Sequence, residues 1–260
     1  MGDAGKTTNN DWLRRSLMTL VHGGGDRASN HTSFVVDQLG LAIVAGEYPP
    51  ETMIPLDPDL CEMFGVSRTV VREAKKTLIA KGLIQSKAKV GTQVRPADGW
   101  NMFDQDVMRW HASVKNPTRY YEELFEIRMI FEPAAAAQAA GRVNQIDCDD
   151  LFSLCDALEN AESRADFALA DYEFHKQVLR LSGNRFLQSL GDLVQTALYS
   201  LFMSESVATF PERRKTVVDR HRTVAAAIAS GVPAEAQEAM RRVINDGYRN
   251  ALPDKAAPAS

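Results

Sequence analysis

The sequence predicts a mostly α-helical protein with an N-terminal winged helix-turn-helix and a C-terminal all-α antiparallel helix bundle. Three observations support this prediction. Residues 57–95 read as helix, tight turn, helix and two short strands, whereas residues 100–250 show helical periods and no convincing strand. The 260 residues are enough for one large domain and a small one. We therefore expect a disordered arm over 1–32, a winged helix-turn-helix over 33–96, an all-helical domain over 97–250 and a flexible tail over 251–260.

The helix-turn-helix is predicted from its capping residues. A first folded helix is expected over 33–45, closed by Gly46. Asp57 is expected to cap a short helix that ends near Phe64, and Gly65 permits a tight turn. Ser67 then caps a second helix that starts at the next residue.

The second of these helices has one apolar face and one basic face. Val71, Ala74 and Leu78 recur at spacings of three and four, which predicts a buried stripe. The side chains expected outside are Arg68, Thr69, Arg72, Lys75 and Lys76. Strands are expected over 83–87 and 92–95, with Gly91 at the hairpin turn. A basic helix beside such a ribbon is typical of a winged helix-turn-helix that reads the DNA major groove.

The charge distribution favours nucleic acid as the partner of this segment. Residues 68–95 hold eight basic side chains and one acidic one, whereas residues 34–67 hold six acids and no Lys or Arg. The net charge of -4 does not exclude DNA, because the basic charge is local. The alternative is a solvated helix with ordinary surface lysines.

The run YPPETMIPLDPDLCEMFGVSRTVVREAKKTLIAKGLI, followed by VGTQV, resembles the winged-helix domain of GntR-type bacterial transcription regulators. The resemblance implies that DNA is contacted by Ser67, Arg68, Thr69, Arg72, Lys89 and Gly91, with Gly91 at the wing tip. Pro58 stands where many relatives carry an Arg early in the first helix of the motif. Because proline cannot contact a phosphate, the operator preference is expected to differ.

The rest of the composition suggests an ordinary soluble protein. No apolar run reaches membrane-spanning length. The three cysteines show no metal-ligand spacing, so a reducing cytoplasm is the expected compartment.

Four polar side chains fall on apolar helix faces of the second domain. Asp171 and His175 are four residues apart on a helix expected over 166–181, and His221 lies on a helix expected over 212–229. Arg128 stands between Leu124 and Phe131 on a third helix. Burying such groups without partners costs several kcal/mol, so we expect these side chains to meet.

Asp171, His175 and His221 make a plausible three-ligand site for a divalent metal such as Zn, Ni or Mn. The alternative is that His175 hydrogen-bonds Asp171 and that His221 is a satisfied core histidine.

The runs EIRMIFEPAAAAQAA, DYEFHKQVLRLSGN and DRHRTVAAAIASG resemble the FCD ligand-binding domain of the FadR branch of the GntR family. Many members hold a metal with one Asp and three His, and the fourth position here is Val243, which cannot ligate. The resemblance therefore leaves a three-ligand site or no metal.

Arg128 is the first candidate to bind a carboxylate effector, because a guanidinium binds carboxylates bidentately. Asn245 and Arg249 are weaker candidates for the same pocket. The alternative for Arg128 is a structural salt bridge with a glutamate such as Glu173. The run GWNMFDQDVMRWH resembles galactonate-operon repressors and related sugar-acid regulators, which implies an aldonate such as galactonate, or a hexuronate.

We interpret the sequence as a DNA-binding regulator that is controlled by a small carboxylate effector, and we expect it to be a repressor. The resemblance implies that it is a homodimer. An acyl-CoA-responsive regulator without metal remains an alternative. A metal-dependent enzyme with a DNA-binding head is a second one, although the sequence shows no separate general base and no nucleophile motif.

Overall fold

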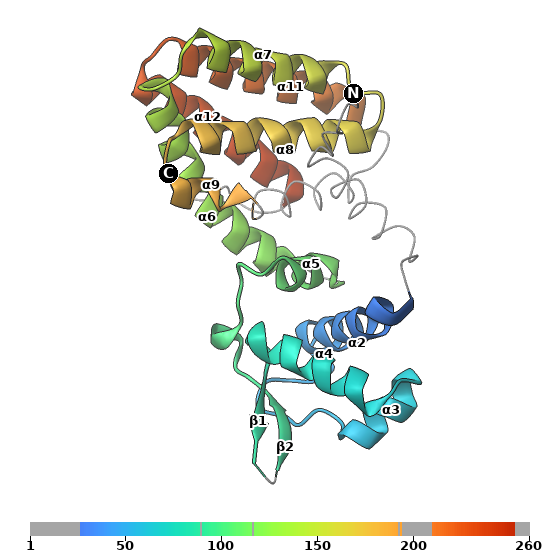
Figure 1. Cartoon of the computed structure of the whole chain (residues 1–260). Coiled ribbons are helices and arrows are strands. Elements are labelled where there is room, and N and C mark those ends of the chain that lie inside the picture. The colour runs from blue at the N-terminus through green and yellow to red at the C-terminus, as the bar shows by residue number, and fades with distance from the viewer. Residues whose placement is uncertain (1–26, 89, 116, 192, 194–209, 253–260) are drawn as a thin grey trace, which may run out of the picture. The chain divides into compact units, whose positions relative to one another are not determined.

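The structure is a computed structural model that describes residues 27–88, 90–115, 117–191, 193 and 210–252 (Figure 1). The chain divides into two compact units, Met1–Trp100 and Asn101–Ser260. The predicted arm lies largely in residues 1–26 and the predicted tail largely in residues 253–260, which are outside the described residues.

The first unit contains the short elements of a winged helix-turn-helix. They are α2 (Arg27–Val44), α3 (Asp57–Phe64), α4 (Arg68–Ala80), β1 (Ile84–Lys87), β2 (Gly91–Val94) and the 3-10 turn Ala97–Gly99. The first helix begins at Arg27, six residues before the expected start at Ser33. Residues 27–32 are therefore helical and not part of a disordered arm. The helical period was masked there by the polar run that precedes Phe34.

Local backbone chemistry sets the turn between α3 and α4. Gly65 adopts the left-handed conformation at φ 64°, which favours glycine. Ser67 caps α4, since its Oγ accepts from the backbone N–H of Val70 at 3.4 Å. The N-cap of α3 is Leu56 and not Asp57. The Leu56 side chain has no polar atom, and its backbone N–H donates to Asp59 Oδ2 instead.

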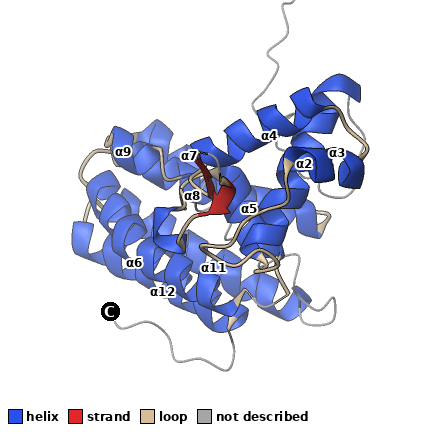
Figure 2. Ribbon diagram, turned by 90° about the horizontal axis from the view of Figure 1, so that it is seen from below, coloured by secondary structure: helices blue, strands red, loops and turns tan. Residues whose placement is uncertain are grey.

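Buried apolar side chains hold the three helices of this unit together. The stripe predicted on α4 is fully buried, and it packs in a core with α2 and α3 through Leu39, Leu60, Val71, Ala74 and Leu78. Figure 2 shows the two strands, coloured red, as one short ribbon. This ribbon is antiparallel, and its register pairs Ile84 with Val94 and Lys87 with Gly91. Each strand begins within one residue of its predicted start.

In the second unit, every regular element in the described residues is a helix. The helices are α5 (Gln105–Ser113), α6 (Thr118–Ala140), α7 (Gln145–Glu159), α8 (Arg164–Leu181), α9 (Arg185–Gln188), α11 (Phe210–Ala229) and α12 (Pro233–Ala251). Helix α6 continues through Pro133, where a kink or a restart was expected.

The helices of the second unit pack around α6 and α8. Helix α6 contacts α8, α11 and α12, and helix α7 contacts α8 and α11 (Figure 1). The core between them contains the aromatic side chains of Phe125, Phe167 and Phe174. In the described part of the chain, no helix combines the length and the apolar character needed to cross a membrane.

Candidate functional site

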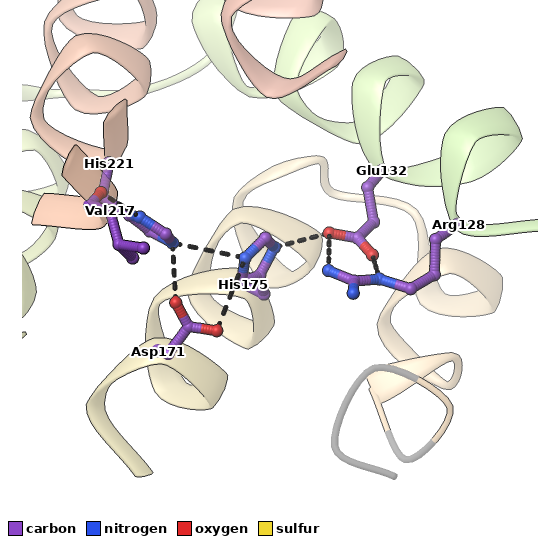
Figure 3. Close-up of polar contacts among 6 residues, drawn as sticks. All are labelled: Arg128, Glu132, Asp171, His175, Val217 and His221. Atoms are coloured by element: carbon purple, nitrogen blue, oxygen red, sulfur yellow. Dashed lines mark hydrogen bonds and ion pairs between the residues drawn. The ribbon is translucent and has the colours of Figure 1, made fainter. Parts of the chain in front are cut away.

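Three of the predicted polar residues meet inside the second unit. Asp171 and His175 lie one turn apart on α8, and His221 lies on α11 (Figure 3). Their exposed fractions are 2%, 1% and 1%. Helix α8 presents both residues inward because Phe167 and Phe174 share their buried face.

The distances within this cluster are short. His221 Nε2 lies 3.0 Å from Asp171 Oδ1 and 3.3 Å from His175 Nε2. His175 Nε2 lies 3.9 Å from Asp171 Oδ2, which is too far for a hydrogen bond. The alternative that His175 hydrogen-bonds Asp171 is therefore wrong, because His221 makes the short contact instead.

The cluster continues on the other side of His175 through two residues of α6. His175 Nδ1 lies 2.5 Å from Glu132 Oε2, and Arg128 Nε donates to Glu132 Oε1 at 2.5 Å (Figure 3). Arg128 Nη2 also donates to Glu132 Oε2 at 3.4 Å. Both Arg128 and Glu132 are 1% exposed. Figure 3 thus shows a continuous polar chain from α6 through α8 to α11.

Glu132 was not among the predicted site residues. The sequence alternative for Arg128 was a salt bridge with Glu173, and the partner in the structure is Glu132. The spacing Arg128 to Glu132 is i, i+4 on one helix, which brings the two side chains to the same face. That spacing was the signal that could have identified Glu132.

The carboxyl groups of Glu132 and Asp171 are both held in the ionised form. Burial raises the pKa of Glu132, but the charges of Arg128 and His175 outweigh burial and lower this pKa to about 2. Burial likewise raises the pKa of Asp171, and the neighbouring His221 outweighs it, so the pKa of Asp171 is lowered. The cluster therefore contains two buried carboxylates beside the nitrogen atoms of Arg128, His175 and His221.

The residues present fit a divalent metal. Asp171, His175 and His221 each offer one ligand atom, and these atoms lie within 4.8 Å of one another. His221 Nδ1 lies 2.7 Å from the carbonyl oxygen of Val217, an acceptor, so Nδ1 donates and Nε2 faces the cluster. Asp171 Oδ2 is buried and has no hydrogen-bond partner among the described residues. A cation at this point would satisfy that oxygen.

The other predicted site residues of the second unit lie outside this chain of contacts. Val243 is buried on α12, and an apolar side chain cannot supply a fourth ligand. Arg249 is largely exposed, with Nη1 3.9 Å from Asp246 Oδ1. Asn245 Oδ1 is buried without a hydrogen-bond partner among the described residues. The effector roles of Asn245 and Arg249 stay predictions.

The run around Asp104 has a local structural role. Asp104 caps α5, because its Oδ1 accepts from the backbone N–H groups of Asp106 and Val107. Trp110 is buried in the same unit. These residues organise the start of the helical unit, so the motif does not itself identify an effector.

The first unit exposes most of the residues predicted to contact DNA. Ser67, Arg68 and Thr69 are exposed at the start of α4. The Arg72 side chain is 70% exposed, and its Nε lies 3.7 Å from Asp57 Oδ2. These four side chains are therefore available to a DNA groove or to phosphates.

Lys75 is less exposed than predicted, since it was expected on the outer face of α4. It is half-buried, and its Nζ donates to Asp57 Oδ1 at 2.8 Å, which ties α4 to α3. Pro58 occupies the first turn of α3, where a missing N–H costs nothing. Gly91 begins β2 at the end of the hairpin turn, and Lys89 lies outside the described residues.

Both units of the chain match known protein families. Residues 31–94 match the bacterial regulatory proteins of the gntR family, and residues 123–246 match the FCD domain. An uncharacterized HTH-type transcriptional regulator of Escherichia coli (strain K12), YieP, is 34% identical over 68% of this chain and 79% of its own length. This chain belongs to the GntR family. As a GntR regulator with an FCD domain, it is a transcription regulator and not an enzyme.

One further relative and one solved structure add to this comparison. The galactonate operon transcriptional repressor of Escherichia coli (strain K12) is 34% identical over 66% of this GntR chain and 76% of that repressor. The solved structure of Lar, titled as controlling the expression of the Listeria monocytogenes agr system, aligns with a TM-score of 0.60. It covers 86% of this chain and 97% of that chain at 20% identity, which supports the fold alone.

Proposed function

We propose that this GntR regulator is a homodimeric repressor that a small sugar acid releases from its operator. The observation that carries the proposal is the buried chain Arg128–Glu132–His175–Asp171–His221, which lies in a domain joined to a winged helix-turn-helix. Buried charges cost several kcal/mol in a core that could have been apolar. A ligand-binding role explains why they are present.

The proposed DNA contacts are Ser67, Arg68, Thr69, Arg72, Lys89 and Gly91. One helix-turn-helix reads a half-site, so two copies are needed for a palindromic operator. A cytoplasmic location follows for a regulator of this kind.

The proposed effector is an aldonate such as galactonate, or a hexuronate. A sugar acid carries a carboxylate and neighbouring hydroxyl groups. The guanidinium of Arg128 would bind the carboxylate of the effector. Because Arg128 already pairs with Glu132, the effector must either displace Glu132 or bind beside it. Asp171, His175 and His221 would hold a divalent metal, Zn, Ni or Mn, which when bound accepts oxygen ligands from the effector. The similarity to the galactonate operon repressor supports this choice of ligand class.

The ligand must prefer the form of the dimer that does not bind DNA. Arg128, Glu132 and His175 lie on α6 and α8, so a ligand there acts on two helices of the bundle. We propose that a shift of α6 and α8 changes the spacing of the two winged helix-turn-helix domains in the dimer.

The test begins with a thermal-shift screen of the full chain against aldonates and hexuronates, with and without chelator. The hits are then added to the protein bound to an operator fragment selected from genomic DNA. We expect a sugar acid to raise the melting temperature and to release the DNA, and chelator to weaken both effects. Stabilisation by acyl-CoA, with no response to any sugar acid, would contradict the proposal.

A further inference from the structure

The Glu132 carboxylate has one partner on each side in the buried chain (Figure 3). Oε1 accepts from Arg128 Nε at 2.5 Å. Oε2 lies 2.5 Å from His175 Nδ1 and accepts a longer hydrogen bond from Arg128 Nη2 at 3.4 Å. We infer that Glu132 is a positioning residue, which keeps the proton of His175 on Nδ1 and so leaves Nε2 free to bind a divalent metal. This inference rests on the metal-binding part of the proposed function.

The proton assignment follows from the chemistry of the two groups. An ionised carboxylate only accepts hydrogen bonds, so the nitrogen facing Glu132 must be a donor. A neutral imidazole carries a single proton. With that proton on Nδ1, the lone pair of His175 Nε2 points to the place where His221 Nε2 and Asp171 converge at 3.3 and 3.9 Å.

The contacts of Arg128 explain why position 132 needs a carboxylate. A guanidinium only donates, and that of Arg128 donates from Nε to Oε1 at 2.5 Å and from Nη2 to Oε2 at 3.4 Å, so both oxygens of Glu132 act as acceptors. His175 Nδ1 needs a second acceptor atom on the same side chain. A carboxylate has two acceptor oxygens, whereas the amide of a glutamine has one oxygen and one NH2 group. Glutamine therefore cannot satisfy both partners in the same way.

The substitution Glu132→Gln thus makes a specific prediction. Arg128 Nε, which makes the shorter of the two guanidinium contacts, retains the amide oxygen, and the NH2 group is then turned to His175. His175 Nδ1 must accept from it, so the proton moves to Nε2, where it blocks the metal-binding lone pair. Because such supporting partners of metal ligands typically change metal affinity about 10–100-fold, we expect a loss of Zn²⁺ affinity of this size.

A second substitution should reverse the effect. In the double variant Arg128→Met with Glu132→Gln, the amide oxygen is no longer required by the guanidinium. It can rotate to accept from His175 Nδ1, which restores the free Nε2 and returns Zn²⁺ affinity toward that of the unsubstituted protein. Glu123→Gln is the matched control. It removes an exposed carboxylate of α6 that pairs with Arg119, also at a spacing of four.

The experiment uses the full chain stripped of metal. Zn²⁺ affinity is measured by competition with a chromophoric chelator, and the protonated nitrogen of His175 is identified by ¹⁵N NMR. The NMR sample is kept about two pH units above the ordinary histidine pKa of about 6.5. We expect a proton on Nδ1 in the unsubstituted protein and in Glu123→Gln, a proton on Nε2 in Glu132→Gln, and Nδ1 again in the double variant.

A proton on Nε2 of His175 in the unsubstituted, metal-free protein would overturn the inference, and this measurement needs no variant to fold. Unchanged Zn²⁺ affinity in a folded Glu132→Gln variant would overturn it as well. Failure of the proposed effector is a separate result. A protein with the Nδ1 proton and Zn²⁺ binding that ignores every sugar acid retains the role of Glu132 and loses the sugar-acid hypothesis.

Discussion

The two units of this GntR regulator place their candidate functional side chains in opposite environments. On α4, Arg68, Thr69 and Arg72 are exposed, and the core beneath them is apolar. In the helical unit, His175 and Glu132 lie in the interior and depend on each other for hydrogen bonds. Substitutions of these exposed α4 side chains should therefore change binding with little effect on folding, whereas those in the buried chain of the second unit should change both.

Within helix α6, a buried ion pair can be compared with an exposed one. It carries two Arg–Glu pairs at a spacing of four, Arg128–Glu132 in the interior and Arg119–Glu123 on the surface. The same residue types thus have different energetic weight within one helix, because water screens the exposed pair and not the buried one.

The largest expected effect is that of Arg128→Ala. This change leaves the Glu132 carboxylate buried without its guanidinium, so we expect a loss of about 3–5 kcal/mol in the free energy of unfolding. Urea unfolding followed by circular dichroism measures it, with Arg119→Ala as the control that should show no clear loss. Equal stability of the two variants would remove the contrast between the pairs.

Arg72→Ala should act on DNA and not on folding. The exposed guanidinium is a candidate base contact, and its loss should weaken operator binding by about 1–3 kcal/mol and relax sequence preference. Fluorescence anisotropy with the selected operator fragment measures the affinity. Arg72→Lys keeps the charge without the planar fork, so it separates base recognition from phosphate attraction. Unaltered affinity in the alanine variant would place Arg72 outside the interface.

Gly91→Ala tests the wing. Gly91 has φ 135°, and a Cβ there would lie 2.7 Å from Met53 Cε, so the change should cost about 1–2 kcal/mol of stability in the first unit. Thermal unfolding measures the loss. Adding Met53→Ala relieves the contact but not the backbone strain, so partial recovery is expected. Full stability in the single variant would show that the wing adapts freely.

Asp57→Asn should have the smallest effect. A hydrogen bond from Lys75 is the main cause that lowers the pKa of Asp57 below its ordinary 3.8. A lowered carboxyl pKa means that the ionised form stabilises the fold above pH 3.8 and that this contribution is lost as pH falls through the folded pKa. Because the pair is partly solvated, we expect under about 1 kcal/mol at neutral pH. Urea unfolding at neutral and acidic pH should show the difference shrinking; a constant difference would argue against Asp57 ionisation as its source.

Much of the first unit was predictable because its signals are local. Gly65 supplies a left-handed turn and Ser67 a helix cap, each within a few residues of the structure it creates. The errors there include a shifted start of α2, the cap of α3 at Leu56 and one contact across helices. Lys75 was expected outside, and only the packing of α3 against α4 brings its Nζ to Asp57.

In the helical unit, the sequence alone determined that Asp171, His175, His221 and Arg128 occupy apolar helix faces, because the helical period fixes which side chains share a face. It did not determine their partners. Arg128 meets Glu132 through their spacing of four on α6, but only the packing of α6 against α8 decided that Glu132 also meets His175. The physical reason is that periodicity assigns a side chain to a direction, whereas a hydrogen bond needs a distance, and the distance between two helices is set only when the whole bundle packs.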